Sequence, residues 1–261
     1  MSAATASPRH RPGYHEALAG LRAAQKPGEG VPAYTRWVNR PLARFAAARA
    51  AAAGLTPNGV TAASATLSAA GLAVLVLAPP TAPTGVVVAV LLAAGYVLDS
   101  ADGQVARLTG TGSPAGEWLD HVVDSVRTPA VHLSVLSAFL LRPQEVGVPG
   151  CPGVVLPLLF CLVAVGQFMA QILAEQLRRG RPGSPGEPAG PLRSFLNLPM
   201  DAGVVCWIFV LWGWPSVFFS AYGTLLAITV VIAATSMRRK YLGLRLQPVP
   251  GTTDRSSSHD R

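Results

Sequence analysis

Six segments of this chain are apolar over lengths that approach the roughly 20 residues that an α-helix needs to cross the core of a bilayer. They are Gly59–Ala78, Gly85–Val105, Glu117–Leu141, Val154–Leu177, Leu198–Trp212 and Val217–Thr235. Pro199 and Asp201 interrupt the start of the fifth segment. Trp207, Trp212 and Trp214, near its end, are typical of anchors at a membrane interface. The sequence therefore predicts an all-α, polytopic membrane protein with six transmembrane helices.

The composition of the chain agrees with this prediction. Only 13% of its residues are charged, 50% are hydrophobic and the mean hydropathy is +0.39, whereas a soluble domain carries about 25% charged residues. An ordinary soluble domain, a disordered chain, collagen and a disulfide scaffold are thereby excluded. The 21 basic residues exceed the 13 acidic ones. Because the basic residues lie beside apolar spans, we expect them to meet anionic phospholipid headgroups rather than nucleic acid.

The segment before the first span has a basic and apolar pattern of its own. Within residues 33–55, Arg36, Arg40 and Arg44 recur every four residues and so lie on one helical face. Trp37 and many alanines accompany them. This pattern predicts an N-terminal amphipathic helix in the membrane interface; the alternative is a solvated helix packed on other protein.

Basic residues also predict the orientation of the chain. Eight precede the first span and six follow the last one, and the connection between the fourth and fifth spans adds four arginines, whereas the opposite connections carry only Arg142. Since basic loops stay in the cytoplasm, we expect a multi-pass protein of the cytoplasmic membrane with both termini and the active site facing the cytoplasm. The predicted parts are a flexible N-terminal segment (1–32), the interfacial helix (33–55), a six-helix membrane domain (56–240) and a polar tail (241–261).

Acidic residues gather at the second and third spans. Five of the thirteen acidic residues fall there within 26 positions: Asp99, Asp102, Glu117, Asp120 and Asp124. A charge inside a membrane helix costs at least ~2.5 kcal/mol on insertion scales. Asp99 and Asp102 share about 100° of one helical face, and Asp120 and Asp124 share a stripe on the next helix. This spacing argues against the alternative, a plain cytoplasmic loop.

Two such faces opposed would bring four carboxylates around a cavity. All-oxygen ligation favours Mg²⁺ or Mn²⁺ over zinc, and a pair of such ions is typical of phosphoryl transfer. Gly103, Ala106 and Gly116 have almost no side chain and would leave room for a bulky polar ligand. Arg107, at the end of the second span, could meet a phosphate or carbonyl oxygen.

The same residues carry a family resemblance. Asp99-x-x-Asp102-Gly103-x-x-Ala106-Arg107, eight residues, then Gly116-x-x-x-Asp120-x-x-x-Asp124, resembles the complete signature of the CDP-alcohol phosphatidyltransferases. The stretch 56–61 resembles a family element that contacts cytidine diphosphate. The resemblance implies a divalent-metal-dependent membrane phosphotransferase of phospholipid biosynthesis that takes a CDP-alcohol lipid donor and an acceptor alcohol and releases CMP.

The resemblance also implies roles for individual residues. Asp99, Asp102 and Asp120 would hold one metal ion, and Asp124 would complete a second site that shares Asp120. Asp124 would also be the general base for the acceptor hydroxyl. The residues expected to contact the CDP-alcohol are Asn58, Gly59, Val60, Thr61, Gly103, Ala106, Arg107, Ser113 and Gly116.

The donor and acceptor are predicted less directly. The stretch 109–117 looks like the choline/ethanolamine phosphotransferase branch, which joins CDP-choline or CDP-ethanolamine to diacylglycerol, but this chain is much shorter. We favour CDP-diacylglycerol and a soluble alcohol. The candidate clamps for a phosphorylated acceptor are Arg127, Arg178, Arg179 and Arg193. Charge balance for Asp124 explains Arg127 equally well, and a cytoplasmic loop explains the other three.

Two further interpretations stay open at this point. The aspartates could form the ion path of a transporter, or the chain could be a non-enzymatic scaffold. The resemblance is also compatible with a homodimer through the later spans, although no small-xxx-small pattern identifies its interface.

Overall fold

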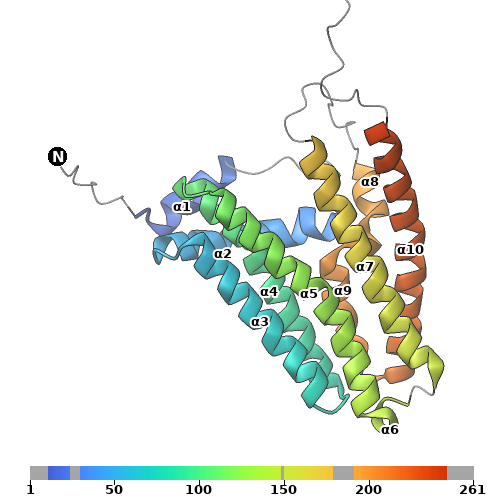
Figure 1. Cartoon of the computed structure of the whole chain (residues 1–261). Helices are drawn as coiled ribbons and strands as arrows, with labels where there is room; N and C mark the ends of the chain where they lie inside the picture. The colour runs from blue at the N-terminus through green and yellow to red at the C-terminus, as the bar shows by residue number, and fades with distance from the viewer. Residues whose placement is uncertain (1–10, 24–29, 148–149, 179–190, 246–261) are drawn as a thin grey trace, which may run out of the picture.

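All elements of the described chain are helices or helical turns. The computed structural model describes residues 11–23, 30–147, 150–178 and 191–245 (Figure 1). In chain order the elements are α1 (Tyr14–Ala23), the π-helical turn η1 (Thr35–Asn39), α2 (Arg40–Ala52), α3 (Pro57–Leu77), α4 (Ala82–Thr109), α5 (Pro114–Leu141), α6 (Pro143–Val146), α7 (Cys151–Arg178), α8 (Pro191–Leu196), the 3-10 turn η2 (Leu198–Met200), α9 (Ala202–Trp207), the 3-10 turn η3 (Ile208–Gly213) and α10 (Pro215–Arg245). The predicted all-α fold is confirmed.

Four helices of the described chain, α3, α4, α7 and α10, are long and apolar enough to cross a membrane. They contain the first, second, fourth and sixth predicted spans. The third predicted span forms the 28-residue helix α5, whose charged and polar side chains keep its hydropathy below that of the other four. The chain is therefore a helical membrane protein with four candidate spans.

The fifth predicted span, Leu198–Trp212, is not one continuous helix. The chain there is divided into η2, α9 and η3, and Ala202–Gly213 forms a shorter apolar helical stretch. Asp201 begins α9, since its carboxylate accepts a 3.0 Å hydrogen bond from the Gly203 amide. At the other end the backbone of Gly213 touches the start of α4, where a Cβ atom would lie only 2.3 Å from the Ala82 nitrogen.

The N-terminal segment expected to be flexible contains a packed helix. In α1, Ala17 and Leu21 are completely buried and form a cluster with Ala43 and Ala47 of α2. Their spacing of four residues places them on one helical face, and Gly20 lets the Leu108 side chain of α4 approach closely. The prediction of a loose segment over 1–32 is therefore wrong for Tyr14–Ala23, because these few apolar residues have a complementary alanine surface to cover.

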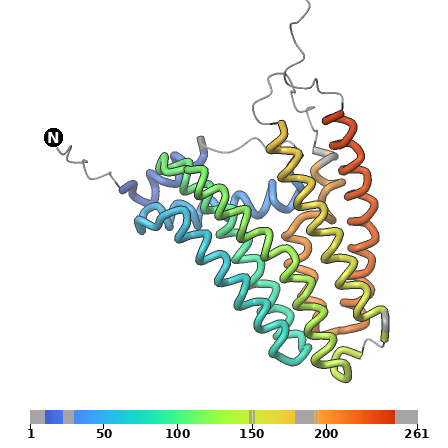
Figure 2. Tube along the Cα trace, viewed as in Figure 1, coloured from blue at the N-terminus to red at the C-terminus, as the bar shows by residue number. Residues whose placement is uncertain are grey.

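The helix predicted over 33–55 is present as η1 followed by α2. It lies across the long helices rather than along them (Figure 1, Figure 2). Its alanines face α1 and α4, whereas Trp37, Leu42 and Phe45 are about half exposed. Its location in a membrane interface stays a prediction.

The long helices form two neighbouring groups. α3 packs against both α4 and α5, and α7 runs beside α10; the groups meet near α6 and separate towards α2 (Figure 2). α3 approaches α4 closely through small residues, because a Cβ atom on Gly95 would lie 2.5 Å from the Ser68 hydroxyl. The Ser64 hydroxyl donates a 2.7 Å hydrogen bond to the Gly95 carbonyl.

An aromatic core joins the two groups. Phe139 of α5 stacks on Trp212 of η3, and Trp212 meets Phe218 of α10 edge to face. Trp212 is only 1% exposed, so the prediction that it anchors the chain at an interface is wrong: it is a core residue. Trp207 and Trp214 are exposed, as an interfacial position requires.

Candidate metal and nucleotide site

A short turn brings the two acidic helix faces together. α4 ends at Gly110, whose positive φ of 62° reverses the chain in the left-handed region that glycine adopts easily. Ser113 then caps α5, since its hydroxyl accepts a 3.1 Å hydrogen bond from the Gly116 amide. Four residues, 110–113, thus separate the two helices, and the chain reverses direction between them.

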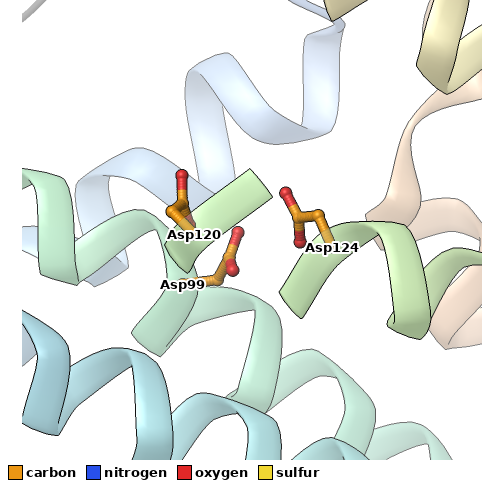
Figure 3. A group of neighbouring side chains, drawn as sticks. All are labelled: Asp99, Asp120 and Asp124. Carbon is orange, nitrogen blue, oxygen red and sulfur yellow. The ribbon is translucent and has the colours of Figure 1, made fainter. Parts of the chain in front are cut away.

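Three of the four predicted aspartates converge between these helices. Asp99 comes from α4, and Asp120 and Asp124 come from α5 (Figure 3). Each offers a carboxylate oxygen, and the three oxygens lie within 4.8 Å of one another. Like charges this close repel unless a cation neutralises them, and oxygen-only donors suit Mg²⁺ or Mn²⁺. The predicted grouping of these three residues agrees with the structure.

Asp102, the fourth predicted aspartate, makes its hydrogen bonds to other residues than the trio. It is buried, and its Oδ2 atom lies 2.5 Å from the Thr61 hydroxyl of α3, which donates to it. Its other oxygen accepts a hydrogen bond from the Gly103 amide. Asp102 is not among the residues whose oxygens form the trio. Thr61, which is expected to contact the nucleotide, thus donates a hydrogen bond to an aspartate in this structure.

Arg127 is a cationic partner of two of the trio aspartates. Its Nη1 atom donates to Asp99 at 2.8 Å and lies 3.3 Å from an Asp124 oxygen. Its Nη2 atom donates to the Ser64 hydroxyl at 2.8 Å. The arginine side chain is only 16% exposed. These contacts favour charge balance over the alternative role as a clamp for an acceptor phosphate.

Sequence reasoning missed Ser64, which supports Arg127 from α3. A signal was available: Thr61, Ser64 and Ser68 repeat at three and four residues within an apolar helix. This spacing places their hydroxyls on one helical face, and polar groups inside a membrane helix need partners.

The residues predicted to contact the CDP-alcohol lie around the starts of α3 and α5 and the end of α4. A Cβ atom on Gly116 would lie 3.4 Å from the Asn58 side chain, so these two predicted residues are neighbours. Gly103 faces the Arg107 side chain in the same way. Arg107 and Ser113 are exposed, whereas Val60 is buried in the packed core. Of the remaining residues, Gly59 is exposed and Ala106 is half-buried.

Of the other predicted clamps, the structure describes the side chain of Arg178, which does not lie with the trio. Arg178 lines a cavity of about 340 Å³ with Gln171, Ala174, Glu175 and Lys240, and no trio aspartate lines it. Lys240, which sequence reasoning also missed, has a buried ammonium group without a hydrogen-bond partner in the described chain. Arg179 and the side chain of Arg193 lie outside the described residues.

Two groups on the transverse helix and its approach have shifted pKa values. Burial raises the pKa of the Tyr34 phenol, although the hydrogen bond that it accepts from Trp207 opposes this. Burial lowers the pKa of the Arg40 guanidinium, and the neighbouring Arg36 adds to the decrease. A guanidinium stays charged at neutral pH, so this edge of the molecule is positive.

Comparison with known families agrees with this geometry. A family model described as CDP-alcohol phosphatidyltransferase matches residues 54–237, from just before α3 to within α10. The match includes all four aspartates and Arg127. A comparison with curated proteins returned no match.

Proposed function

Because the chain belongs to the CDP-alcohol phosphatidyltransferase family, and is therefore a transferase of substituted phosphate groups in phospholipid synthesis, we propose that it transfers a phosphatidyl group from CDP-diacylglycerol to a soluble acceptor alcohol. The single observation that carries the proposal is the aspartate trio with its arginine partner. Acidic side chains are energetically costly in a membrane protein, so a cluster of them usually marks a functional site.

The proposed topology has six membrane segments. α5 would be one of them, with its acidic end at the cytoplasmic edge, and the interrupted stretch Ala202–Gly213 would be another. Broken helices are tolerated at membrane depth where protein surrounds them, and the buried Trp212 and Phe209 support such packing. Both termini and the trio would face the cytoplasm, with the transverse helix in the interface of the cytoplasmic membrane.

The donor set fits two Mg²⁺ or Mn²⁺ ions. Asp99, Asp120 and Asp124 would hold them, and Asp102 would complete the first site after its carboxylate turns away from Thr61. When bound, the two ions would neutralise the pyrophosphate and the charge that develops on the leaving CMP.

Asp124 is the proposed general base. Its side chain is 28% exposed, whereas that of Asp99 is 15% exposed, and its contact with Arg127 is longer, at 3.3 Å against 2.8 Å. Asp124 is therefore the carboxylate better able to reach an incoming hydroxyl. It would take the hydroxyl proton as the acceptor oxygen bonds to the lipid-bearing phosphorus and the bond to CMP breaks.

The proposed nucleotide contacts are Asn58, Gly59, Val60, Thr61, Gly103, Ala106, Arg107, Ser113 and Gly116. The adjacency of Asn58 and Gly116 supports a pocket between the starts of α3 and α5.

An acceptor phosphate would meet Arg178, Arg179 or Arg193. Only 17% of the most apolar stretch of α7 is buried within the protein. Its exposed side chains would therefore contact either lipid or a second copy of the chain.

The test is release of CMP by the purified protein in detergent. CDP-diacylglycerol would be paired with glycerol phosphate, inositol phosphate or serine, and CDP-choline or CDP-ethanolamine with diacylglycerol. We expect CMP and a new phospholipid, identified by mass spectrometry, with a CDP-diacylglycerol pair and Mg²⁺ or Mn²⁺, and neither product in EDTA.

Each outcome of this assay has a stated meaning. Turnover only with the CDP-choline or CDP-ethanolamine pair would establish the alternative branch. Folded protein that releases no CMP with any pair would contradict the proposal. Metal uptake into vesicles in that case would support a transporter.

A further inference from the structure

A buried asparagine links the transverse helix to the turn of α4 that carries the metal-site aspartates. The Nδ2 atom of Asn39 donates to the Tyr96 carbonyl at 3.2 Å and to the Ser100 hydroxyl at 2.5 Å. Ser100 directly follows Asp99 in the helix and lies two residues before Asp102. The Asn39 side chain thus contacts the backbone and a side chain of the turn from which these carboxylates project.

A second set of hydrogen bonds reaches the same turn from α9. The Asp201 carboxylate accepts the Thr35 amide at 2.7 Å and the Thr35 hydroxyl at 2.9 Å. Since the Thr35 hydroxyl donates its single hydrogen to Asp201, the Tyr96 hydroxyl, 2.6 Å away, donates to Thr35. Asp201, Thr35 and Tyr96 therefore form one chain of hydrogen bonds from α9 through η1 to α4.

These groups are deeply buried and costly to keep. Asn39 is 0% exposed and Asp201 is 1% exposed. The Oδ1 atom of Asn39 has no hydrogen-bond partner among the described residues, and an unpaired buried acceptor lowers stability. An apolar residue would fill this position at a lower cost. Departures of this kind, like the π-helical turn η1 that carries Thr35 and Asn39, are most often found at functional sites.

We propose that Asn39 is a positioning residue, which fixes the rotation of α4 about its axis and thereby sets the affinity of the aspartate trio for divalent cations. Thr35 and Asp201 support it at the neighbouring Tyr96. Groups that orient metal ligands typically change metal affinity by about 10- to 100-fold when they are removed. This inference rests on the proposed function, because it requires a metal site at the trio.

The test measures binding of Mn²⁺ to the purified protein by electron paramagnetic resonance, together with the Mg²⁺ dependence of CMP release. We expect Asn39→Ala to raise the Kd for Mn²⁺ about 10-fold. The Mg²⁺ concentration for half-maximal activity should rise by a similar factor, with full activity approached at high Mg²⁺. The matched control is Tyr222→Phe, which removes another buried hydrogen bond, 2.6 Å to His132, between α10 and α5. It should lower thermal stability and leave the Kd for Mn²⁺ unchanged.

Ser100→Ala keeps the inference testable if Asn39→Ala does not fold. It removes one of the two Asn39 contacts, leaves a good helix former in α4, and should raise the Kd about 3-fold. Where both variants fold, the double variant should raise the Kd by less than the product of the two single effects, because the residues share one hydrogen bond.

The results separate this inference from the proposed function. Wild-type protein that binds Mn²⁺ while Asn39→Ala and Ser100→Ala bind it equally well would overturn the positioning role alone. An equal loss of affinity in Tyr222→Phe would also overturn it, since the effect would then be general destabilisation. Wild-type protein that neither binds Mn²⁺ nor releases CMP would overturn the proposed function and this inference together.

Discussion

Arg127 balances part of the negative charge of the trio, and this has a cost in buried polar groups. Arg127 contacts Asp99, Asp124 and Ser64, and its Nε atom is buried without a hydrogen-bond partner in the described chain. Removing one partner from a buried group of charges leaves the others uncompensated. A divalent cation at the trio would also neutralise part of the negative charge of these aspartates.

Replacing Arg127 with glutamine should therefore lower the stability of the metal-free protein more than that of the metal-bound protein. We expect Arg127→Gln to lower the melting temperature in EDTA by about 5 °C or more, and to enlarge the stabilisation that Mg²⁺ produces. The measurement is thermal denaturation in detergent with and without Mg²⁺. An unchanged melting temperature in EDTA would show that Arg127 does not stabilise the trio.

Asp124 offers a second prediction at this scale. Asp124→Asn keeps the size of the side chain and one oxygen ligand but removes the base, so turnover should fall by about 10²- to 10⁴-fold while Mn²⁺ binding is partly retained. Steady-state CMP release and Mn²⁺ binding measure the two effects. Glu117→Gln is the control, because Glu117 lies about two turns earlier on α5 and contacts His121. A wild-type rate in Asp124→Asn would remove Asp124 as the base.

At the scale of elements, the contact between α3 and α4 depends on the absence of side chains. Ser64, Ser68 and Gly71 of α3 face Gly95 and its neighbours on α4. Small residues allow membrane helices to approach closely and gain van der Waals contact. This contact also holds the Ser64 hydroxyl beside Arg127.

Adding one methyl group at Gly95 should push these helices apart. The new Cβ atom would lie 2.5 Å from the Ser68 hydroxyl and 3.1 Å from the Ser64 carbonyl, so Gly95→Ala should cost about 1–3 kcal/mol of stability. Thermal denaturation followed by size-exclusion chromatography measures the loss. Gly223→Ala is the matched control, since its Cβ atom would meet only Leu156, at an ordinary 3.5 Å. Equal stability of the two variants would contradict the close packing of α3 on α4.

Helices that carry a long apolar run or a regular spacing of aspartates were predictable from the sequence. Helices that form because they pack against residues far away in the sequence were not. The apolar runs predicted α3, α4, α7 and α10, because length and hydropathy alone decide such helices. The spacing of the aspartates predicted the trio, since two periodic faces joined by a short turn have few ways to meet. Helix α1 was missed because its packing depends on alanines 22 or more residues away in the sequence.

The remaining differences also arise from contacts between distant segments. Tryptophan is common at membrane interfaces, but Trp212 packs between Phe139 and Phe218. Asp102 shares a motif with Asp99, yet the Thr61 hydroxyl of another helix holds its carboxylate. Nothing in the spacing of Asn39 indicates that it reaches Ser100, 61 residues later.

At the scale of the whole molecule, the transverse helix and the basic connections predict which side each turn faces. The α4–α5 turn, beside the trio, should face the cytoplasm, and the α3–α4 turn should face the opposite side. Arg142, after α5, donates to the Leu77 carbonyl at the end of α3, so these two ends lie at the same side of the molecule.

Cysteine labelling in intact cells checks this orientation. In a background where Cys151, Cys161 and Cys206 are replaced by alanine, Pro79→Cys should react with a membrane-impermeant maleimide from outside, because Pro79 is exposed in the α3–α4 turn. Thr111→Cys, at a position that is also exposed and lies in the α4–α5 turn, should react only after the cells are permeabilised. The reverse pattern would invert the proposed topology.

The short turn between α4 and α5 has a consequence for the order of assembly. Ser64, the three trio aspartates and Arg127 all precede residue 142, so the ribosome has delivered every one of them before α7 to α10 exist. Contacts between consecutive helices form fast because little chain entropy is lost in closing the loop. The chemical centre can thus assemble early during vectorial synthesis. Apart from Asp201, which supports α4 through Thr35, later segments would then be able to diverge, and with them the choice of acceptor, without disturbing what is already built.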